Sequence, residues 1–106
     1  MTSVMLAAAC AVALISSSAP SAALAQDTNL ARNLAATCAN CHGTNGQARG
    51  EMRPLAGMPA ERTVAMLASY KTDALPATIM NQIAKGYTDE QIRLVAAYFA
   101  ALPAQK

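Results

Sequence analysis

The feature that most constrains this chain is a cluster of two cysteines and its only histidine within five residues, in the order C-A-N-C-H from Cys38 to His42. If this stretch is helical, Cys38 lies three residues before Cys41 and four before His42, so the three side chains share one face. Three chemistries could use such a cluster: a dithiol redox site, a zinc site, or covalent attachment of a haem.

The composition indicates that the domain carries something bulky. The chain has 106 residues, no Trp and one Phe, and alanine is its most common apolar residue. A domain this small buries little apolar surface and usually needs a disulfide, a metal or another bound group. We therefore expect a thin core whose centre is filled by a group that is not part of the polypeptide.

The N-terminus is typical of a secretory signal peptide. An apolar run from Val4 to Ile15 is followed by serines and then by Ala23-Leu24-Ala25, an A-x-A cleavage site. The run is too short to span a bilayer, which takes about 20 apolar residues. It has no Lys or Arg before it, which departs from the usual pattern. We predict a signal peptide at 1–25, one mature domain at 26–106, export to the periplasm, and no membrane span in the mature protein.

The charge pattern gives little support to a nucleic-acid partner. Eight Lys/Arg against six Asp/Glu leave a formal net charge of +2, and the basic residues form no run. Such a weak bias is compatible with docking on a mildly acidic protein surface.

Helical spacing runs through the mature chain, and no strand-like alternation occurs. Leu30, Leu34 and Cys38 recur every four residues and predict a helix that leads into the cysteine cluster. Pro59 stands where a second helix can begin, and Val64 and other apolar residues continue it at helical spacing. The fold class predicted is all-α.

Two further helices are expected in the second half. Pro76 is predicted to open a short helical turn that ends at Gly86. Thr88 and Gln91 form a capping box that begins the last helix, and Pro103 ends it.

Context separates the three chemistries. A C-x-x-C redox site is expected beside strands and helices of a βαβ unit, which this chain lacks. A closed zinc site needs about four ligands, so a carboxylate would have to complete the set, and the mature chain has no second ligand cluster. C-x-x-C-H is the attachment motif of c-type haem: Cys38 and Cys41 can each bond a vinyl group while the imidazole of His42 reaches the iron. The export signal agrees with this choice, because such attachment occurs outside the bacterial cytoplasm.

At these residues the chain resembles a class I c-type cytochrome, of the kind that forms the cytochrome subunit of flavocytochrome c sulfide dehydrogenase. The segments that carry the resemblance are CANCHGTNG, PLAGM, TIMNQIAKGY and YTDEQIRLVAAYFA, which together span most of the mature domain. The resemblance implies three to four helices around one covalently bound haem c, with the first and last helices crossing.

The resemblance also implies two further site residues. Pro54 lies twelve residues after His42, where the family has a proline whose backbone carbonyl accepts a hydrogen bond from the histidine Nδ1. Met80 matches the methionine that supplies the sixth iron ligand, opposite His42. A bis-histidine haem is excluded because the chain has one histidine. Met66, inside a predicted helix, is expected to fill the core instead.

The function implied is that of a one-electron carrier with His/Met ligation. In the resembling family the cytochrome accepts electrons from an FAD-containing subunit, so a flavoprotein dehydrogenase of the sulfide dehydrogenase type is the expected partner. The alternatives are a freely diffusing cytochrome that serves an oxidase or another dehydrogenase, and a five-coordinate haem that acts as a peroxidase or gas sensor. The chain has no flavin-binding motif of its own, so any flavin chemistry would belong to the partner. Whether the chain is an independent electron-transfer protein or a non-catalytic subunit of an oxidoreductase is left open.

Some positions depart from the family pattern. Asn81 and Gln82 stand where relatives often carry Gly and Arg, and the segment SYKTDAL lacks the glycine usual after its lysine. The partners of the haem propionates therefore cannot be assigned from the sequence.

Overall fold

The computed structural model describes residues 29–106, and the expected signal peptide at 1–25 lies outside them. Every regular element in the described part is a helix, which confirms the all-α class. After a helical stretch at 29–35 the elements are η1 (Ala36–Cys38), α2 (Ala39–His42), η2 (Thr44–Gly46), α3 (Ala60–Lys71), α4 (Met80–Lys85) and α5 (Asp89–Ala100).

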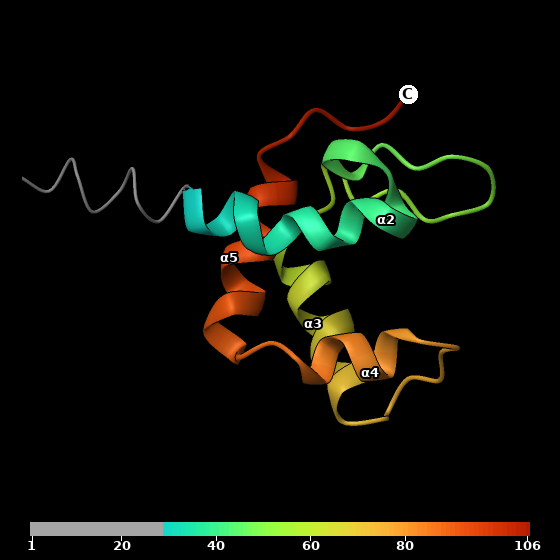
Figure 1. Ribbon diagram of the computed structural model, residues 1–106, viewed down its shortest axis with the longest axis vertical. Coiled ribbons are helices and arrows are strands. Elements are labelled where there is room, and N and C mark those ends of the chain that lie inside the picture. Colours follow the sequence, from blue (N-terminus) through green and yellow to red (C-terminus); the bar gives the residue numbers. More distant parts are fainter. Residues whose placement is uncertain (1–28) are drawn as a thin grey trace, which may run out of the picture.

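The N-terminal helical segment, residues 29–42, crosses the C-terminal helix α5 (Figure 1). It is one continuous helical path in which the 3-10 turn η1 separates two α-helical parts. At the crossing Ala35 packs against Val95 and Phe99 of α5, and all three are buried. The crossing of first and last helices therefore rests on one small and two larger side chains.

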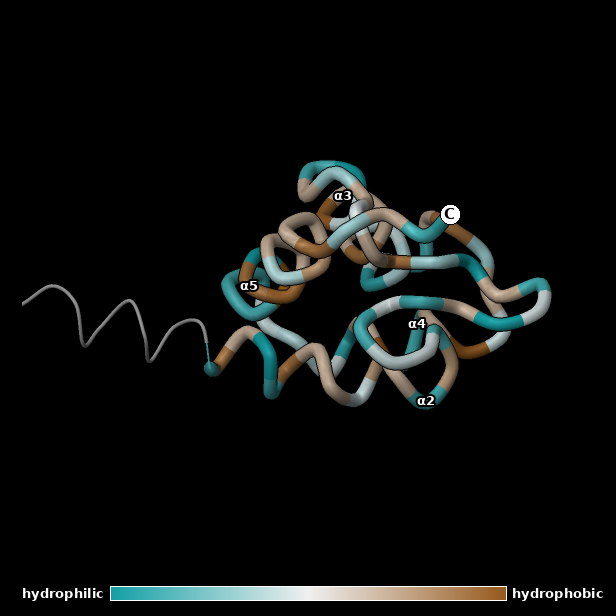
Figure 2. Tube along the Cα trace, turned by 90° about the horizontal axis from the view of Figure 1, so that it is seen from above, coloured by the Kyte–Doolittle hydropathy of each residue, from teal (hydrophilic) through white to brown (hydrophobic). Residues whose placement is uncertain are grey.

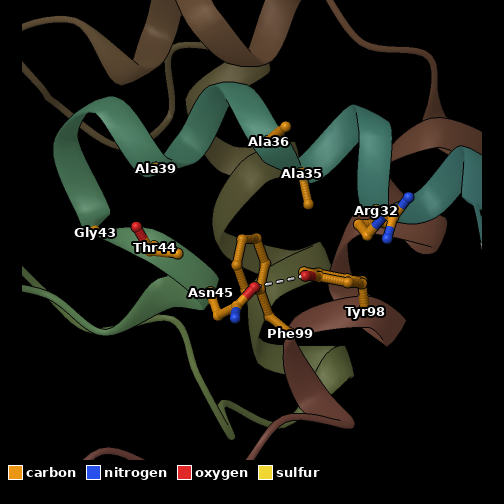
Figure 3. Close-up of a pocket in the computed structure, with 9 residues that line it drawn as sticks. All are labelled: Arg32, Ala35, Ala36, Ala39, Gly43, Thr44, Asn45, Tyr98 and Phe99. Carbon is orange, nitrogen blue, oxygen red and sulfur yellow. Dashed lines mark hydrogen bonds between the residues drawn. The ribbon is translucent and has the colours of Figure 1, made fainter.

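A side-chain hydrogen bond fastens the turn after α2 to the same crossing. The hydroxyl of Tyr98 donates to Oδ1 of Asn45 at 2.8 Å. Figure 3 shows this bond at the edge of a small hollow between Ala35 and Phe99. Asn45 has a φ of 54°, the left-handed conformation that asparagine tolerates better than most residues.

Helix α5 begins with the expected capping box. The Thr88 hydroxyl accepts from the backbone N–H of Gln91 at 3.1 Å, and the Gln91 side chain accepts from the N–H of Thr88 at 2.9 Å. The helix ends at Ala100, before Pro103. Its buried residues, Ile92, Val95, Ala96 and Phe99, recur at helical spacing and so share one face, and both hydrophilic and hydrophobic residues occur along the helix (Figure 2).

Helix α4 begins four residues later than expected, at Met80 rather than at Pro76. A helix opening at Pro76 would need the carbonyl of Leu75 for its first backbone bond, to the N–H of Ile79. That carbonyl instead accepts from the side-chain amide of Asn81 at 2.9 Å. Ile79 has a non-helical backbone, at φ −139° and ψ −22°, and becomes the N-cap. The predicted end at Gly86 is confirmed.

The core is thin, as the composition predicted. Most of the buried hydrophobic residues are alanines, and Ala84 and Ala96 are fully buried. Phe99 is the largest fully buried side chain within 29–106. Across these residues we find no helix with the length and apolar character needed to cross a membrane.

Candidate cofactor site

A cavity of about 720 Å³ lies between the N-terminal helical segment, α3 and α4. Its size falls within the range of about 300–1,000 Å³ that is typical of small-molecule and cofactor sites. Cys38, Cys41 and His42 all line it, as the shared helical face predicted. The helix thus presents its three reactive side chains to one cavity.

The two cysteines differ in exposure. Cys38 is half-buried and Cys41 is exposed. Burial raises the pKa of the Cys38 thiol, and a hydrogen bond with the Thr37 side chain partly offsets the rise. Thr37 is itself held by the Tyr87 hydroxyl at 2.6 Å, which joins this part of the helix to the segment after α4.

His42 is oriented by the loop that follows it. Its Nδ1 donates to the backbone carbonyl of Arg53 at 2.7 Å, which leaves Nε2 free to act as a ligand. We expected the carbonyl of Pro54, so the residue assignment was wrong by one position. The backbone N–H groups of Leu55 and Ala56 both donate to the carbonyl of Gly46, which fixes the chain directly after Pro54. In this loop conformation the Arg53 carbonyl faces the imidazole of His42.

Met80 lies on another wall of the same cavity, at the first residue of α4. The cavity therefore brings together His42 and Met80, which are 38 residues apart in the sequence. Met52, Met58 and Met66 line it as well. Lining alone therefore does not single out a sulfur ligand.

The cavity fits a large flat apolar group with a few polar substituents. Most of its lining is hydrophobic, and it includes Leu67 and Ile83 from two different helices. Thr63, also in the lining, has a buried hydroxyl without a hydrogen-bond partner in the structure. An unmet buried donor is costly, by about 1–3 kcal/mol, and a polar group on a bound molecule would satisfy it.

The arrangement does not suit zinc. Among residues 29–106, no three His, Cys, Asp or Glu side chains come together in a group that could hold a metal ion. The carboxylate that a zinc site would need beside the cluster is therefore missing from the described part.

Comparison with known protein families decides what the cavity holds. The cytochrome c family model matches residues 29–103. The chain belongs to the cytochrome c family. Membership supports a role as an electron carrier and implies one covalently attached c-type haem, for which Cys38 and Cys41 fit the C-x-x-C-H attachment motif.

Individual cytochromes agree with this assignment. The chain is 38% identical over 69 residues to the cytochrome subunit of sulfide dehydrogenase from Chlorobaculum tepidum, a match that covers 65% of this chain and 63% of that subunit. It is 34% identical over 71 residues to cytochrome c-553 of Desulfomicrobium norvegicum, covering 64% of this chain and 89% of the relative. The chain thus spans less than two thirds of the sulfide dehydrogenase subunit.

A solved cytochrome has the same fold. The structure of cytochrome c4 from Acidithiobacillus ferrooxidans superposes with a TM-score of 0.62 and 32% identity, and the match covers 69% of this chain and 50% of that one. The class I cytochrome c fold is confirmed.

Sequence reasoning missed three residues of this cytochrome's site. Arg53 was hidden because the hydrogen bond uses its backbone, which carries no side-chain signal. Thr63 falls on the apolar face of a helix, where only its polarity among apolar neighbours could have marked it. Asn81 was noticed as a departure from the family pattern, but no role was assigned to it.

Proposed function

We propose that the chain is a periplasmic one-electron carrier that accepts electrons from a flavoprotein dehydrogenase of the sulfide dehydrogenase type. His42 and Met80 would be the protein ligands of the haem iron, and Cys38 and Cys41 would hold the haem covalently. The observation that carries the proposal is the single cavity lined by all four of these residues. The likeness to a sulfide dehydrogenase cytochrome subunit supports the partner.

The protein's own residues set the conditions for this role. When bound, haem supplies a one-electron Fe(III)/Fe(II) couple. The Arg53 carbonyl fixes the tautomer and ring orientation of His42 and increases the basicity of Nε2. The Met80 thioether is a soft, neutral ligand that favours the reduced state and raises the reduction potential. With both positions filled by protein, no site is open to substrate.

The cavity opens at the surface near two exposed hydrophobic residues. Met52 is 44% exposed and Ile79 is 57% exposed, and both line the cavity. A partner that docks there comes close to the bound group without having to open the fold. A small contact is sufficient for such a transient redox encounter.

Two lysines whose charge would otherwise steer a partner are already paired. The Lys71 ammonium donates to the backbone carbonyl of Tyr87 at 2.7 Å and to Asp89 at 3.0 Å. Lys85 pairs with Asp73 at 2.8 Å. These two lysines are therefore expected to contribute little to electrostatic steering, and apolar contact at the cavity mouth is expected to contribute to docking.

The test is purification of the protein from the native periplasm under gentle conditions. We expect a protein with a flavin absorption spectrum to copurify, and sulfide to reduce the haem in that fraction. After the flavoprotein is removed by size-exclusion chromatography, reduction of the haem by sulfide should slow to the rate of the direct reaction. A cytochrome that purifies alone, and that no periplasmic fraction reduces with sulfide, would contradict the partner and favour a freely diffusing carrier.

A further inference from the structure

The helix that carries Met80 is too short to hold its own position. Helix α4 has six residues, Met80–Lys85, and no side chain caps its N-terminus. Isolated helices shorter than about 12 residues are marginal in water, so tertiary contacts must set where this one lies. Because Met80 is the first residue of this helix, the position of its side chain depends directly on those contacts.

Two side chains of α4 bind the loop that ends α3. The Asn81 amide donates to the backbone carbonyls of Leu75 at 2.9 Å and Tyr70 at 3.3 Å. The Lys85 ammonium donates to both carboxylate oxygens of Asp73, at 3.0 and 2.8 Å. The loop is thus held at both ends of α4.

These contacts lie on the side of α4 that does not face the cavity. Asn81 and Lys85 are four residues apart and share a helix face, and neither lines the cavity. Met80 and Ile83 do line it. Turning the helix so that Met80 leaves the cavity would therefore pull Asn81 and Lys85 away from the loop.

The loop is shaped to receive both groups. Asp73 has a φ of 60°, a left-handed conformation that is unfavourable for most non-glycine residues. The hydrogen bond from Lys85 lowers the pKa of Asp73, so its carboxylate stays charged and able to accept. The groups on α4 thus bind the backbone on both sides of this left-handed turn and the carboxylate at it.

We propose that Asn81, together with the Lys85–Asp73 ion pair, is a positioning device that keeps Met80 at the haem iron. This inference rests on the proposed ligation by Met80. The device matters most in the ferric state, where a thioether is the weaker ligand and is exchanged more readily. Asn81 is a positioning residue because it acts through α4 and does not line the cavity.

The test measures how readily imidazole replaces Met80 in the ferric protein with haem attached. Asn81→Ala removes two hydrogen bonds, so we expect the apparent affinity for imidazole to rise about tenfold. Lys85→Gln breaks an exposed ion pair and should raise it by roughly twofold. Asn33→Ala, at an exposed asparagine of the N-terminal helical segment, is the matched control and should leave it unchanged.

The outcomes separate the inference from the proposed function. Before the comparison, the parent ferric protein must show the weak far-red absorption band of methionine-ligated haem; absence of that band would overturn both. A band in the parent with no rise in imidazole affinity in Asn81→Ala would overturn the inference alone. A lower melting temperature with unchanged affinity would do the same, since it would show a structural role only. If Asn81→Ala does not fold, the inference is tested by Lys85→Gln: the roughly twofold rise in imidazole affinity supports it, and an unchanged affinity overturns it.

Discussion

The four methionines of the described part show what a single residue contributes to this site. All four line the cavity, but Met66 lies in the middle of α3 while Met80 is the first residue of α4. Met66 was expected to fill the core. In the structure it is half-buried and forms part of the cavity wall. Sulfur chemistry is the same at both positions, so position on the fold has to select the ligand.

Replacing these two methionines tests that selection. We expect Met80→Ala to abolish the far-red band of the ferric protein and to lower the reduction potential, because the iron loses its thioether ligand. Met66→Ala should retain the band and cost about 2–5 kcal/mol at most, through loss of packing. Absorption spectra of the two ferric variants provide the measurement. A five-coordinate haem in the unchanged protein, with rapid CO binding, would favour a peroxidase or gas sensor instead.

A second residue-scale prediction concerns two glycines of the loop after His42. Gly46 has a φ of 71°, and a Cβ there would lie 2.6 Å from the backbone nitrogen of Ala56. Gly50 has a φ of 63°, but nothing lies within 4 Å of a Cβ. Gly50→Ala should therefore cost about 1–2 kcal/mol from backbone strain alone.

Gly46→Ala adds a clash with backbone to the same strain, so it should cost at least about 2 kcal/mol more. It should also displace the segment that carries the Arg53 carbonyl, since Gly46 accepts from both Leu55 and Ala56. Urea denaturation of the two variants compares the costs. Equal losses of stability would show that the close contact with Ala56 is unimportant.

The residues of the site were predictable wherever side-chain chemistry marks them. Cys38, Cys41 and His42 form a motif whose spacing alone places them on one face, and the structure puts all three in one cavity. The prediction that the Pro54 carbonyl orients His42 was wrong by one residue, because the Arg53 carbonyl does so. Backbone carbonyls are identical along a chain, so the sequence does not distinguish them. Only the fold of the loop determines which one points at the imidazole.

At the scale of elements, the sequence predicted a helix end correctly where residues of the same helical turn cap it. The capping box of Thr88 and Gln91 is confirmed because both partners lie within one helical turn. The start of α4 was wrong because the carbonyl of Leu75 is taken by Asn81, a contact made when the chain folds back. A proline permits a helix start but does not require one.

The Thr88 cap provides an element-scale prediction. Thr88→Ala removes the acceptor for the Gln91 N–H, so the free energy of unfolding should fall by about 1 kcal/mol. Ser69→Ala is the control: its hydroxyl bonds back to the Ala65 carbonyl inside α3, an interaction that slightly disfavours a helix. Chemical denaturation should show a loss for the first variant and little change for the second. Equal losses would contradict a specific capping effect.

The ion pair between α3 and α5 predicts a pH dependence. The hydrogen bond from Lys71 lowers the pKa of Asp89 in the folded protein. The pair's contribution is therefore fully present above the unfolded pKa of about 4, and it is lost as the pH falls through the lower folded pKa. Stability relative to Asp89→Asn should shrink as the pH drops below about 4.

Urea midpoints at a series of pH values measure this effect. Glu90→Gln changes the neighbouring carboxylate, which lies outside the Lys71 pair, and is the matched control. Both positions are in the first turn of α5, so a helix-dipole effect is common to the two variants. If the two variants respond alike to pH, the ion pair has no specific role.

At the scale of the whole molecule, the sequence predicted an interior that the polypeptide does not fill. Ala31, Ala35, Ala84 and Ala96 are buried, and Phe99 is the main large side chain among them. Such small side chains leave the cavity of about 720 Å³ beside the cysteines. Composition and motif together could predict this, whereas the way the loops close around the cavity depends on long-range contacts such as Tyr87 with Thr37.

The account rests on a haem joined permanently to Cys38 and Cys41 as part of this interior. The most direct test is the intact mass of the purified protein under denaturing conditions, with a Cys38→Ser/Cys41→Ser variant as control. We expect the mass of the polypeptide plus one haem for the parent, and a haem-free, largely unfolded chain for the variant. A parent protein that is folded and has the mass of the polypeptide alone would contradict the account.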